Sequence, residues 1–186
     1  MRRTITWQDM PPIVADRCLP AMQVWRKLPK EIRAEVIGGT LYILGNSTTC
    51  HAKVCGQIFF ELMLELRKSE AGEVFPGGVR VFLNDDDDVV IPDIVFVSKK
   101  NESLVRRNAV HGAADLHIEI LSPGNSKHDR VTKKKLYEKA GVKEYWIIDP
   151  ETKETWGYLL DGDRYDEVLV MNSKLHVRVL DKIIDF

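Results

Sequence analysis

The sequence has no long apolar run and few cysteines. None of its 186 residues lies in an apolar stretch approaching the ~20 residues of a membrane-spanning helix. Two arginines follow Met1, but no apolar segment comes after them, so a signal peptide is not predicted. Cys18, Cys50 and Cys55 are odd in number and form no CxxC pair. This pattern excludes a disulfide framework and a cysteine zinc site, and we expect a cytoplasmic protein with reduced thiols and no membrane partner.

Several nucleotide- and ion-binding motifs are also absent. The chain has no P-loop pattern, so no nucleotide cofactor is expected, and it has no zinc finger or RNA-recognition motif. Four consecutive aspartates, residues 85–88, lack the spacing and the glycine of an EF-hand, and we interpret them as a solvated hairpin tip. The formal net charge of −1 argues against a constitutive nucleic-acid coat protein but allows a local basic face.

The composition is that of one globular domain. Hydrophobic residues make up 44% and charged residues 30% of the sequence, and the length suffices for a sizeable core. No repeat, low-complexity segment or linker divides the chain, so residues 1–186 are expected to form a single domain. Prolines interrupt residues 1–33, which we interpret as a covering arm with a short helix near residues 21–28.

A hairpin and a helix follow this arm. Residues 34–44 are apolar on both sides of a Gly-Gly turn and predict a β-hairpin, with Glu35 on its first strand. Polar residues next offer N-caps for a helix over about residues 51–68. His51 lies on the apolar stripe of that helix, where a histidine is more often a hydrogen-bonded core residue than a ligand. It is a secondary site candidate.

A strand–loop–helix–strand unit at residues 116–150 organises the rest of the chain. Its helix is predicted from Ser126 or Asp129 to about Ala140, with a glycine stop after it. Further strands are predicted at 79–83, 89–97, 144–148, 155–160, 165–171 and 175–180, and loops at 72–78 and 98–114. The strands at 155–160 and 165–171 are predicted to form a C-terminal antiparallel pair around Asp161-Gly162-Asp163, and the strand at 175–180 follows them.

Two carboxylates interrupt apolar strands. Pro92 breaks the strand at 89–97, because proline cannot donate to a sheet ladder, and Asp93 follows at once. In the strand at 116–121, alternation places Glu119 in the middle of an otherwise apolar segment. A lone buried charge is costly, so each carboxylate requires a compensating partner.

One lysine of the predicted helix faces the core. Leu136 and Tyr137 follow Lys133 at i+3 and i+4, so Lys133 lies on the apolar face that packs on the sheet. Lys134 and Lys135 are rotated toward solvent. A lysine and a carboxylate are therefore aimed at the layer between one strand and the next helix, either as a structural ion pair or as part of an active site.

Asp93, Glu119 and Lys133 fit the hydrolysis of a phosphodiester. Two carboxylates on neighbouring strands repel each other unless a positive group lies between them, and a divalent cation supplies that charge. Magnesium takes carboxylate and water oxygens and leaves positions for a phosphate. A nearby lysine can orient the attacking water or neutralise charge in the transition state. We expect the two carboxylates to lie within ~5 Å of each other, facing one cleft.

These residues resemble those of a known superfamily. Pro92-Asp93 and Glu119, with a following lysine, resemble the PD-(D/E)XK nucleases. A longer pattern is similar to the Uma-two family of restriction endonucleases; it comprises Glu35-Val36-Ile37-Gly38-Gly39, His51, Glu119-Ile120-Leu121-Ser122-Pro123, Asp129, Lys133, Tyr137, Gly141-Val142, Glu144-Tyr145-Trp146 and Asp149-Pro150. The resemblance covers about residues 30–170. It implies a restriction endonuclease-like α/β core, a mixed β-sheet flanked by α-helices, with Asp93 and Glu119 as ligands of Mg²⁺ or Mn²⁺.

The chain departs from the superfamily pattern at one position. The usual lysine follows the acidic residue by two on the same strand, and here that position is Leu121. Lys133 is the lysine that both the family pattern and the helical face select. Glu35 is a further candidate metal ligand, although a strand-end glutamate beside a turn is commonly exposed, and Tyr137 is a secondary candidate.

The predicted helix also carries a basic patch. Residues 127–143 hold seven lysines and arginines against two acidic residues. Such an asymmetric patch suits phosphate-backbone binding, although a solvated helix face has the same composition. The residues expected to contact a DNA backbone are Lys127, Arg130, Lys134 and Lys135.

Together these features predict that the protein is a magnesium- or manganese-dependent DNA endonuclease. A homodimer is expected, because two related sites cut both strands of a duplex most easily. Two alternatives remain open at this point. One is an inactive nuclease-fold protein that binds DNA or a protein partner, and the other is a structural domain in which Glu119 and Lys133 form a salt bridge.

Overall fold

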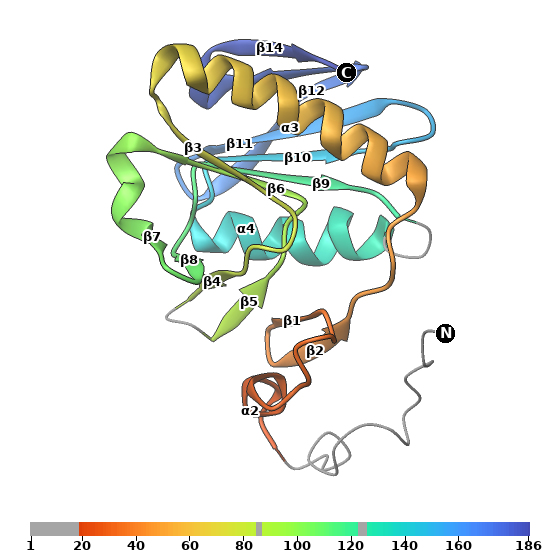
Figure 1. Cartoon of the computed structure of the whole chain (residues 1–186), viewed down its shortest axis with the longest axis vertical. Helices are drawn as coiled ribbons and strands as arrows, with labels where there is room; N and C mark the ends of the chain where they lie inside the picture. The colour runs from red at the N-terminus through yellow and green to blue at the C-terminus, as the bar shows by residue number, and fades with distance from the viewer. Residues whose placement is uncertain (1–18, 85–86, 123–125) are drawn as a thin grey trace.

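The computed structural model describes residues 19–84, 87–122 and 126–186, and its centre is a six-stranded mixed sheet (Figure 1). The strands lie in the order β12 (Arg164–Asn172), β11 (Glu154–Asp161), β10 (Glu144–Ile148), β9 (Leu116–Ile120), β6 (Ile94–Ser98) and β3 (Gly72–Pro76). Strands β9 and β10 are parallel and the other neighbouring pairs are antiparallel. Parallel neighbours need a long crossover, and the helical segment after β9 supplies it.

Helices cover both faces of this sheet (Figure 1). Helix α3 (Thr49–Ser69) packs on one face, and the π-helical segment η3 (His128–Lys133) with α4 (Lys134–Ala140) packs on the other. Alternation along β9 places Leu116, Ile118 and Ile120 in the α3-side core. Glu119 consequently faces η3 and α4, as the sequence pattern predicts.

Helix α3 begins and ends at clear local signals. The Thr48 side chain accepts a hydrogen bond from the His51 backbone N–H at 3.1 Å, which caps the first turn. Glu70 adopts a left-handed conformation, with φ of 51°, and ends the helix. The buried stripe between them repeats every four residues at Val54, Ile58, Leu62 and Leu66. This stripe fixes which side of the helix meets the sheet, and it leaves His51 at the buried N-terminal end.

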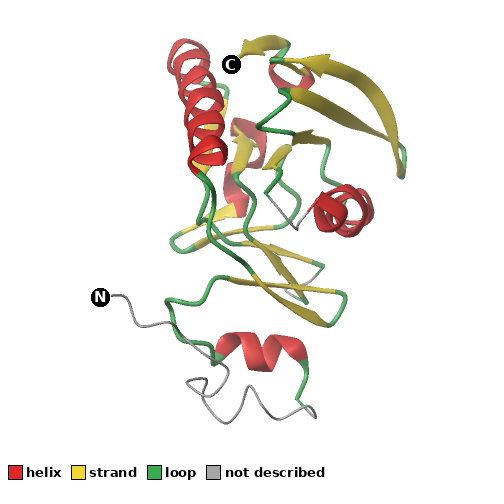
Figure 2. Cartoon of the chain, turned by 90° about the vertical axis from the view of Figure 1, so that its right-hand side faces the viewer, coloured by secondary structure: helices red, strands yellow, loops and turns green. Residues whose placement is uncertain are grey.

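The N-terminal hairpin belongs to a second six-stranded sheet. Its order is β2 (Thr40–Ile43), β1 (Ala34–Ile37), β5 (Asp88–Val90), β4 (Val81–Leu83), β8 (Ala109–His111) and β7 (Val105–Arg106). Gly38 and Gly39 have φ of 55° and 73°, which suits a two-residue hairpin turn. Helix α2 (Ala21–Arg26) packs against β1 and β2, at the end of the molecule opposite the C-terminal hairpin (Figure 2).

The predicted strand at residues 89–97 is split between the two sheets. Strand β5 ends at Val90 in the N-terminal sheet, and β6 begins at Ile94 in the central sheet. Pro92, which cannot donate to a ladder, lies in the break. Asp93 therefore lies where the chain passes from one sheet to the other.

A second hairpin closes the α3 side. Strands β13 (Lys174–Val177) and β14 (Lys182–Asp185) flank a 3₁₀ turn, η4 (Arg178–Leu180). Glu144 of β10 is fully buried, and its carboxylate accepts hydrogen bonds from the backbone N–H groups of Arg178 and Val179. These bonds connect the hairpin to the central sheet.

Several sequence-based boundaries are wrong. The predicted loop at 72–78 contains β3, a short edge strand that ends at a proline and so carries a weak strand pattern. The predicted polar loop at 98–114 contains η2 (Lys99–Leu104), β7 and β8. The predicted strand at 175–180 ends at Val177, and β14 was not predicted.

The aspartate run is only partly a solvated tip. Asp85 and Asp86 lie outside the described residues. Asp87 is exposed, but Asp88 is buried and its carboxylate accepts hydrogen bonds from the Gly38 N–H at 2.6 Å and the Asn84 amide at 2.5 Å. The prediction fails for Asp88 because these donors compensate its burial.

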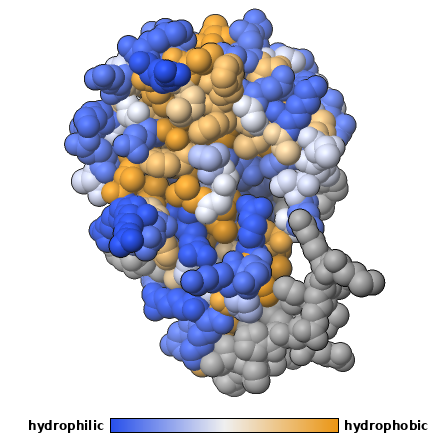
Figure 3. Space-filling view, in the orientation of Figure 1, coloured by the Kyte–Doolittle hydropathy of each residue, from blue (hydrophilic) through white to orange (hydrophobic). Residues whose placement is uncertain are grey.

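The surface over α3 is partly apolar. Phe60 and Met63 point away from the core and are 58% and 37% exposed. Figure 3 shows apolar and hydrophilic side chains interspersed over the upper half of this face, where α3 runs. No helix in the described part of the chain is both long enough and apolar enough to cross a membrane.

Candidate active site

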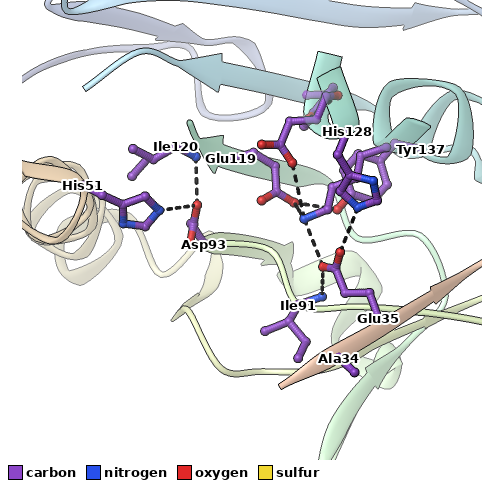
Figure 4. Close-up of polar contacts among 12 residues, drawn as sticks. Ala34, Glu35, His51, Ile91, Asp93, Glu119, Ile120, His128 and Tyr137 are labelled. Carbon is purple, nitrogen blue, oxygen red and sulfur yellow. Dashed lines mark hydrogen bonds and ion pairs between the residues drawn. The ribbon is translucent and has the colours of Figure 1, made fainter. Parts of the chain in front are cut away.

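Asp93 is held in place by two donors from different elements. Its Oδ2 accepts a hydrogen bond from the Ile120 backbone N–H at 2.8 Å and lies 3.1 Å from Nε2 of His51 (Figure 4). The Asp93 side chain is 16% exposed. Ile120 directly follows Glu119 in β9, so this hydrogen bond places Asp93 beside the same end of the strand as Glu119.

Glu119 is buried in the middle of β9. Its Oε1 accepts hydrogen bonds from Nζ of Lys133 at 2.9 Å and from the Tyr137 hydroxyl at 2.7 Å. Both donors come from the helical crossover that follows the strand. The crossover thus compensates the charge that alternation buries in β9.

Lys133 lies at the centre of a carboxylate cluster. Its Nζ is 2.9 Å from Oε1 of Glu119, 3.0 Å from Oε1 of Glu35 and 3.6 Å from Oδ1 of Asp129. The lysine side chain is 4% exposed. A buried ammonium group is stable only with such compensation. Because Glu35 belongs to the N-terminal sheet and Glu119 to the central sheet, the ion pairs of Lys133 connect the two sheets.

Glu35 is fully buried, which corrects the expectation that a strand-end glutamate beside a turn is exposed. Its Oε1 accepts a hydrogen bond from the Ile91 N–H at 2.8 Å and also contacts Lys133, and its Oε2 lies 3.2 Å from Nε2 of His128. Both oxygens therefore have protein partners. This arrangement suits a residue that holds Lys133 better than it suits a metal ligand.

Burial and mutual contacts shift the ionisation of this cluster. Burial raises the pKa of the Glu119 carboxyl well above its usual range, Lys133 opposes the rise, and nearby carboxylates add to it. Burial alone would lower the pKa of Lys133, but Glu119, Glu35 and Asp129 raise it well above its usual range. Burial would raise the pKa of Glu35, but Lys133, His128 and the Ile91 N–H lower it overall. A surplus of carboxylates around one ammonium group favours a further cation.

Asp93 and Glu119 line the same small pocket. Its volume is about 40 Å³, enough for a few atoms of water size, and His51, Asp129 and Lys133 also line it. Within the described residues, Oδ1 of Asp93 and Oε2 of Glu119 accept no hydrogen bond. Two carboxylates that line one pocket, each with an oxygen that accepts no hydrogen bond in the described part of the chain, fit a hard cation such as Mg²⁺.

The side-chain ligand set in this pocket is small. In the described part of the chain no three His, Cys, Asp or Glu side chains converge in metal-binding geometry. A cation at Asp93 and Glu119 would therefore complete its shell with water, backbone or substrate oxygens. Magnesium sites commonly have such a shell, with one or two carboxylates.

His51 and Tyr137, the secondary candidates, both support a carboxylate. His51 is 6% exposed and contacts Asp93 through Nε2, while its buried Nδ1 has no hydrogen-bond partner among the described residues. Burial, and then Glu119, raises the pKa of Tyr137 well above its usual range, so its hydroxyl stays a donor to Glu119. Each residue restrains one of the two carboxylates that line the pocket.

Sequence reasoning missed Arg33. Arg33 was assigned to the covering arm. In the structure its exposed side chain lines the pocket of Asp93 and Glu119. It has no carboxylate partner within ion-pair distance among the described residues. Alternation along the chain would have indicated it, since Arg33 lies two residues before Glu35 and so shares its side of the strand.

The four predicted DNA-backbone residues differ in their surroundings. Lys127 and Lys135 are exposed, and for Lys135 this exposure was predicted. Lys134 was predicted to turn to solvent, but it is half-buried and its Nζ lies 4.0 Å from the ring centroid of Tyr158. Arg130 is half-buried as well. The cause is that β11 lies beside the helix, which the helical period alone does not reveal.

Comparisons with known proteins agree with this fold. A family model described as "Putative restriction endonuclease", Uma2, matches residues 20–183. A crystal structure from Anabaena variabilis ATCC 29413, described as a "putative nuclease belonging to DUF820", is similar with a TM-score of 0.66 and 18% sequence identity. The match covers 87% of this chain and 97% of that chain, and it supports the fold alone. No curated protein matches the sequence. Since the family model spans most of the chain, this protein belongs to the Uma2 family.

Proposed function

We propose that this protein is a magnesium- or manganese-dependent endonuclease that hydrolyses DNA phosphodiester bonds. The observation that carries the proposal is the pocket lined by Asp93, Glu119 and the buried Lys133. Each of the two carboxylates keeps one oxygen that accepts no hydrogen bond from a described residue. Family membership supports the same reaction class. The fold by itself would not, because one fold can serve many functions.

Asp93 and Glu119 are the proposed metal ligands. His51 and the Ile120 N–H orient Asp93, while Lys133 and Tyr137 orient Glu119 through its other oxygen. A bound Mg²⁺ would polarise the phosphoryl group and stabilise the charge that develops during hydrolysis. Rigid second contacts of this kind keep ligating oxygens aimed at one point.

Lys133 and Arg33 supply positive charge to the pocket. Lys133 lies next to Glu119 and is held in a cationic state, so it can orient the attacking water and neutralise developing negative charge. Arg33 is an exposed guanidinium with no ion-pair partner in the described part of the chain, and it would hold a phosphate at the mouth of the pocket. A homodimer would bring two such sites to the two strands of a duplex.

One observation favours a second candidate, an inactive nuclease-fold protein that binds DNA or a protein partner. Lys133 is in contact with three carboxylates, and the pocket of about 40 Å³ is small. If this ion-pair network only stabilised the fold, the cluster would need no metal. Metal binding therefore separates the two candidates.

The experiment is a cleavage assay on supercoiled plasmid, single-stranded DNA and RNA, with Mg²⁺ or Mn²⁺ and with EDTA. The proposal expects metal-dependent cutting of DNA by the native protein and loss of cutting in Asp93→Asn and Glu119→Gln. Calorimetric titration with Mn²⁺ should show binding to the native protein and weaker binding to both variants. If the native protein binds DNA but neither cuts it nor binds Mn²⁺, the inactive alternative is selected.

A further inference from the structure

Two basic side chains of the helical crossover lie against aromatic rings of β11. Cζ of Arg130 is 3.7 Å from the ring centroid of Trp156, and Nζ of Lys134 is 4.0 Å from that of Tyr158. Nε of Arg130 also donates a hydrogen bond to Oγ of Ser126 at 3.2 Å. Cation–π contacts of this kind restrain long side chains that would otherwise move freely in solvent.

The charge of both side chains remains available. Within the described residues neither Arg130 nor Lys134 has a carboxylate within ion-pair distance. Stacking occupies the face of the Arg130 guanidinium and leaves in-plane N–H groups free for an anion. The exposed Lys135, on the same helix, has no such aromatic partner in the described part of the chain.

The sheet register places these cations close to the candidate active site. Glu119 pairs with Ile147 of β10, and Ile147 pairs with Trp156 of β11, so the three side chains share one row and one face. Two strand spacings of about 4.8 Å put Trp156 roughly 10 Å from Glu119 across the sheet. Arg130 and Lys134 are four residues apart, which is about one helical turn.

We propose that Arg130 and Lys134, positioned by Trp156 and Tyr158, bind the sugar–phosphate backbone of DNA beside the bond that is cut. This inference rests on the proposed nuclease function and names the surface that the substrate strand follows. Two cations one turn apart suit successive phosphates of one strand. Because the aromatic rings already restrain them, less side-chain freedom is lost on binding than for an exposed lysine.

The test measures binding of a fluorescein-labelled duplex by anisotropy, in EDTA and over a series of salt concentrations. Arg130→Gln and Lys134→Gln are compared with Lys135→Gln. The sequence also predicts a DNA contact for Lys135, but this exposed lysine lacks an aromatic partner in the described part of the chain, so a smaller effect is expected. Each of the first two variants should reduce the slope of log affinity against log salt by about 1 and weaken binding at low salt. Lys135→Gln should change the slope by less than half as much. Equal effects in all three variants would overturn the proposal.

Trp156 is tested as a positioning residue. Trp156→Leu removes the ring and should weaken DNA binding roughly two- to five-fold, because a cation–π contact at a half-exposed site contributes about 0.5–1 kcal/mol. Trp156→Phe should restore most of the affinity. In the Arg130→Gln background Trp156→Leu should have no further effect, since the ring acts through the arginine. Thermal unfolding of each variant shows that it is folded, and an additive double variant would contradict the positioning role.

Cleavage and DNA binding by the native protein, measured side by side, distinguish a failure of this inference from a failure of the proposed function. If it cuts DNA while Arg130→Gln and Lys134→Gln bind like the Lys135→Gln control, only the proposed surface is wrong. If it binds DNA with the expected variant effects but never cuts, the surface stands and the catalytic proposal fails. If the native protein binds no DNA, both proposals fail.

Discussion

Lys133 donates a hydrogen bond from Nζ to Oε1 of Glu119 at 2.9 Å, although the two residues are 14 positions apart and lie on different elements. The lysine comes from η3, a π-helical segment whose wide turn precedes α4. Such segments are rare and occur frequently at functional sites. In the PD-(D/E)XK pattern the lysine follows the acidic residue by two positions on the same strand. Here the helical crossover brings Lys133 to Glu119 instead.

Replacing Lys133 tests its catalytic role. Lys133→Met should reduce cleavage by ~10²–10³-fold, because a preorganised cation beside the reacting phosphate is lost. Lys135→Met, at an exposed position of the same helix, should cleave almost normally. Initial rates on plasmid DNA, corrected for the folded fraction, give the comparison. Equal losses in the two variants would assign the effect to the basic surface.

The same substitution should destabilise the fold. Removing one partner from a buried ion-pair network typically costs ~3–5 kcal/mol of unfolding free energy, because the remaining charges are left uncompensated. In Lys133→Met those charges are mainly Glu119 and Glu35. Mg²⁺ at millimolar concentration should recover part of the loss if it binds Glu119. Urea unfolding with and without Mg²⁺ measures both effects, and a variant as stable as the native protein would refute the network's structural role.

Glu35→Gln distinguishes a support for Lys133 from a metal ligand. The amide oxygen of glutamine can still accept the Ile91 N–H, but the contact with Lys133 loses its charge. We expect a loss of ~1–3 kcal/mol in unfolding free energy and nearly unchanged Mn²⁺ affinity by calorimetry. Glu31→Gln, at an exposed site shortly before strand β1, is the control for stability. A tenfold loss of Mn²⁺ affinity would instead make Glu35 a ligand.

Arg33→Ala should weaken the contact of the protein with the substrate phosphate. The guanidinium lines the pocket, and losing one phosphate contact should lower kcat/KM by roughly tenfold, about 1.4 kcal/mol. Mn²⁺ affinity should stay the same, because arginine is no metal ligand. Arg26→Ala, which removes an exposed arginine of α2 that does not line this pocket, serves as the control. Steady-state cleavage of a short duplex provides the measurement, and matching values for the two variants would exclude the role.

Asp115 should make stability depend on pH in the acid range. Burial would raise the pKa of its carboxyl, but Lys143, the Ser98 N–H and the Asn101 amide hold this pKa below its ordinary value overall. A lowered folded-state pKa stabilises the protein above the unfolded-state value, and the contribution disappears as pH falls through the folded-state value. The native protein should therefore exceed Asp115→Asn in stability at pH 6, and the difference should shrink below about pH 4.

Urea unfolding from pH 6 to pH 3 tests this prediction. Asp185→Asn serves as a control, because Asp185 pairs with Lys174 at the surface and its side chain is 69% exposed. Removing an exposed pair of this kind changes stability little at any pH. A stability difference for Asp115→Asn that stays constant over the whole range would contradict the lowered pKa.

Sequence periodicity determined the local directions of the key side chains. The alternation at residues 116–121 places Glu119 on the face opposite Leu116 and Ile118, and the helical period places Lys133 with Leu136 and Tyr137. Both predictions are confirmed, because the backbone geometry of a strand or a helix fixes side-chain direction within a few residues. The Pro92 break and the Gly-Gly turn are likewise local signals, and the structure contains both.

Only the tertiary structure decided which distant residues meet. His128 reaches Glu35 across 93 positions, His51 reaches Asp93 across 42, and the stacking of Arg130 on Trp156 requires the register of β10 with β11. The sequence placed Arg33 in a covering arm and Glu35 at a strand end beside a turn, where a glutamate is commonly exposed. Their places depend on how the two sheets pack, which is set by the summed burial of many apolar side chains rather than by any local pattern.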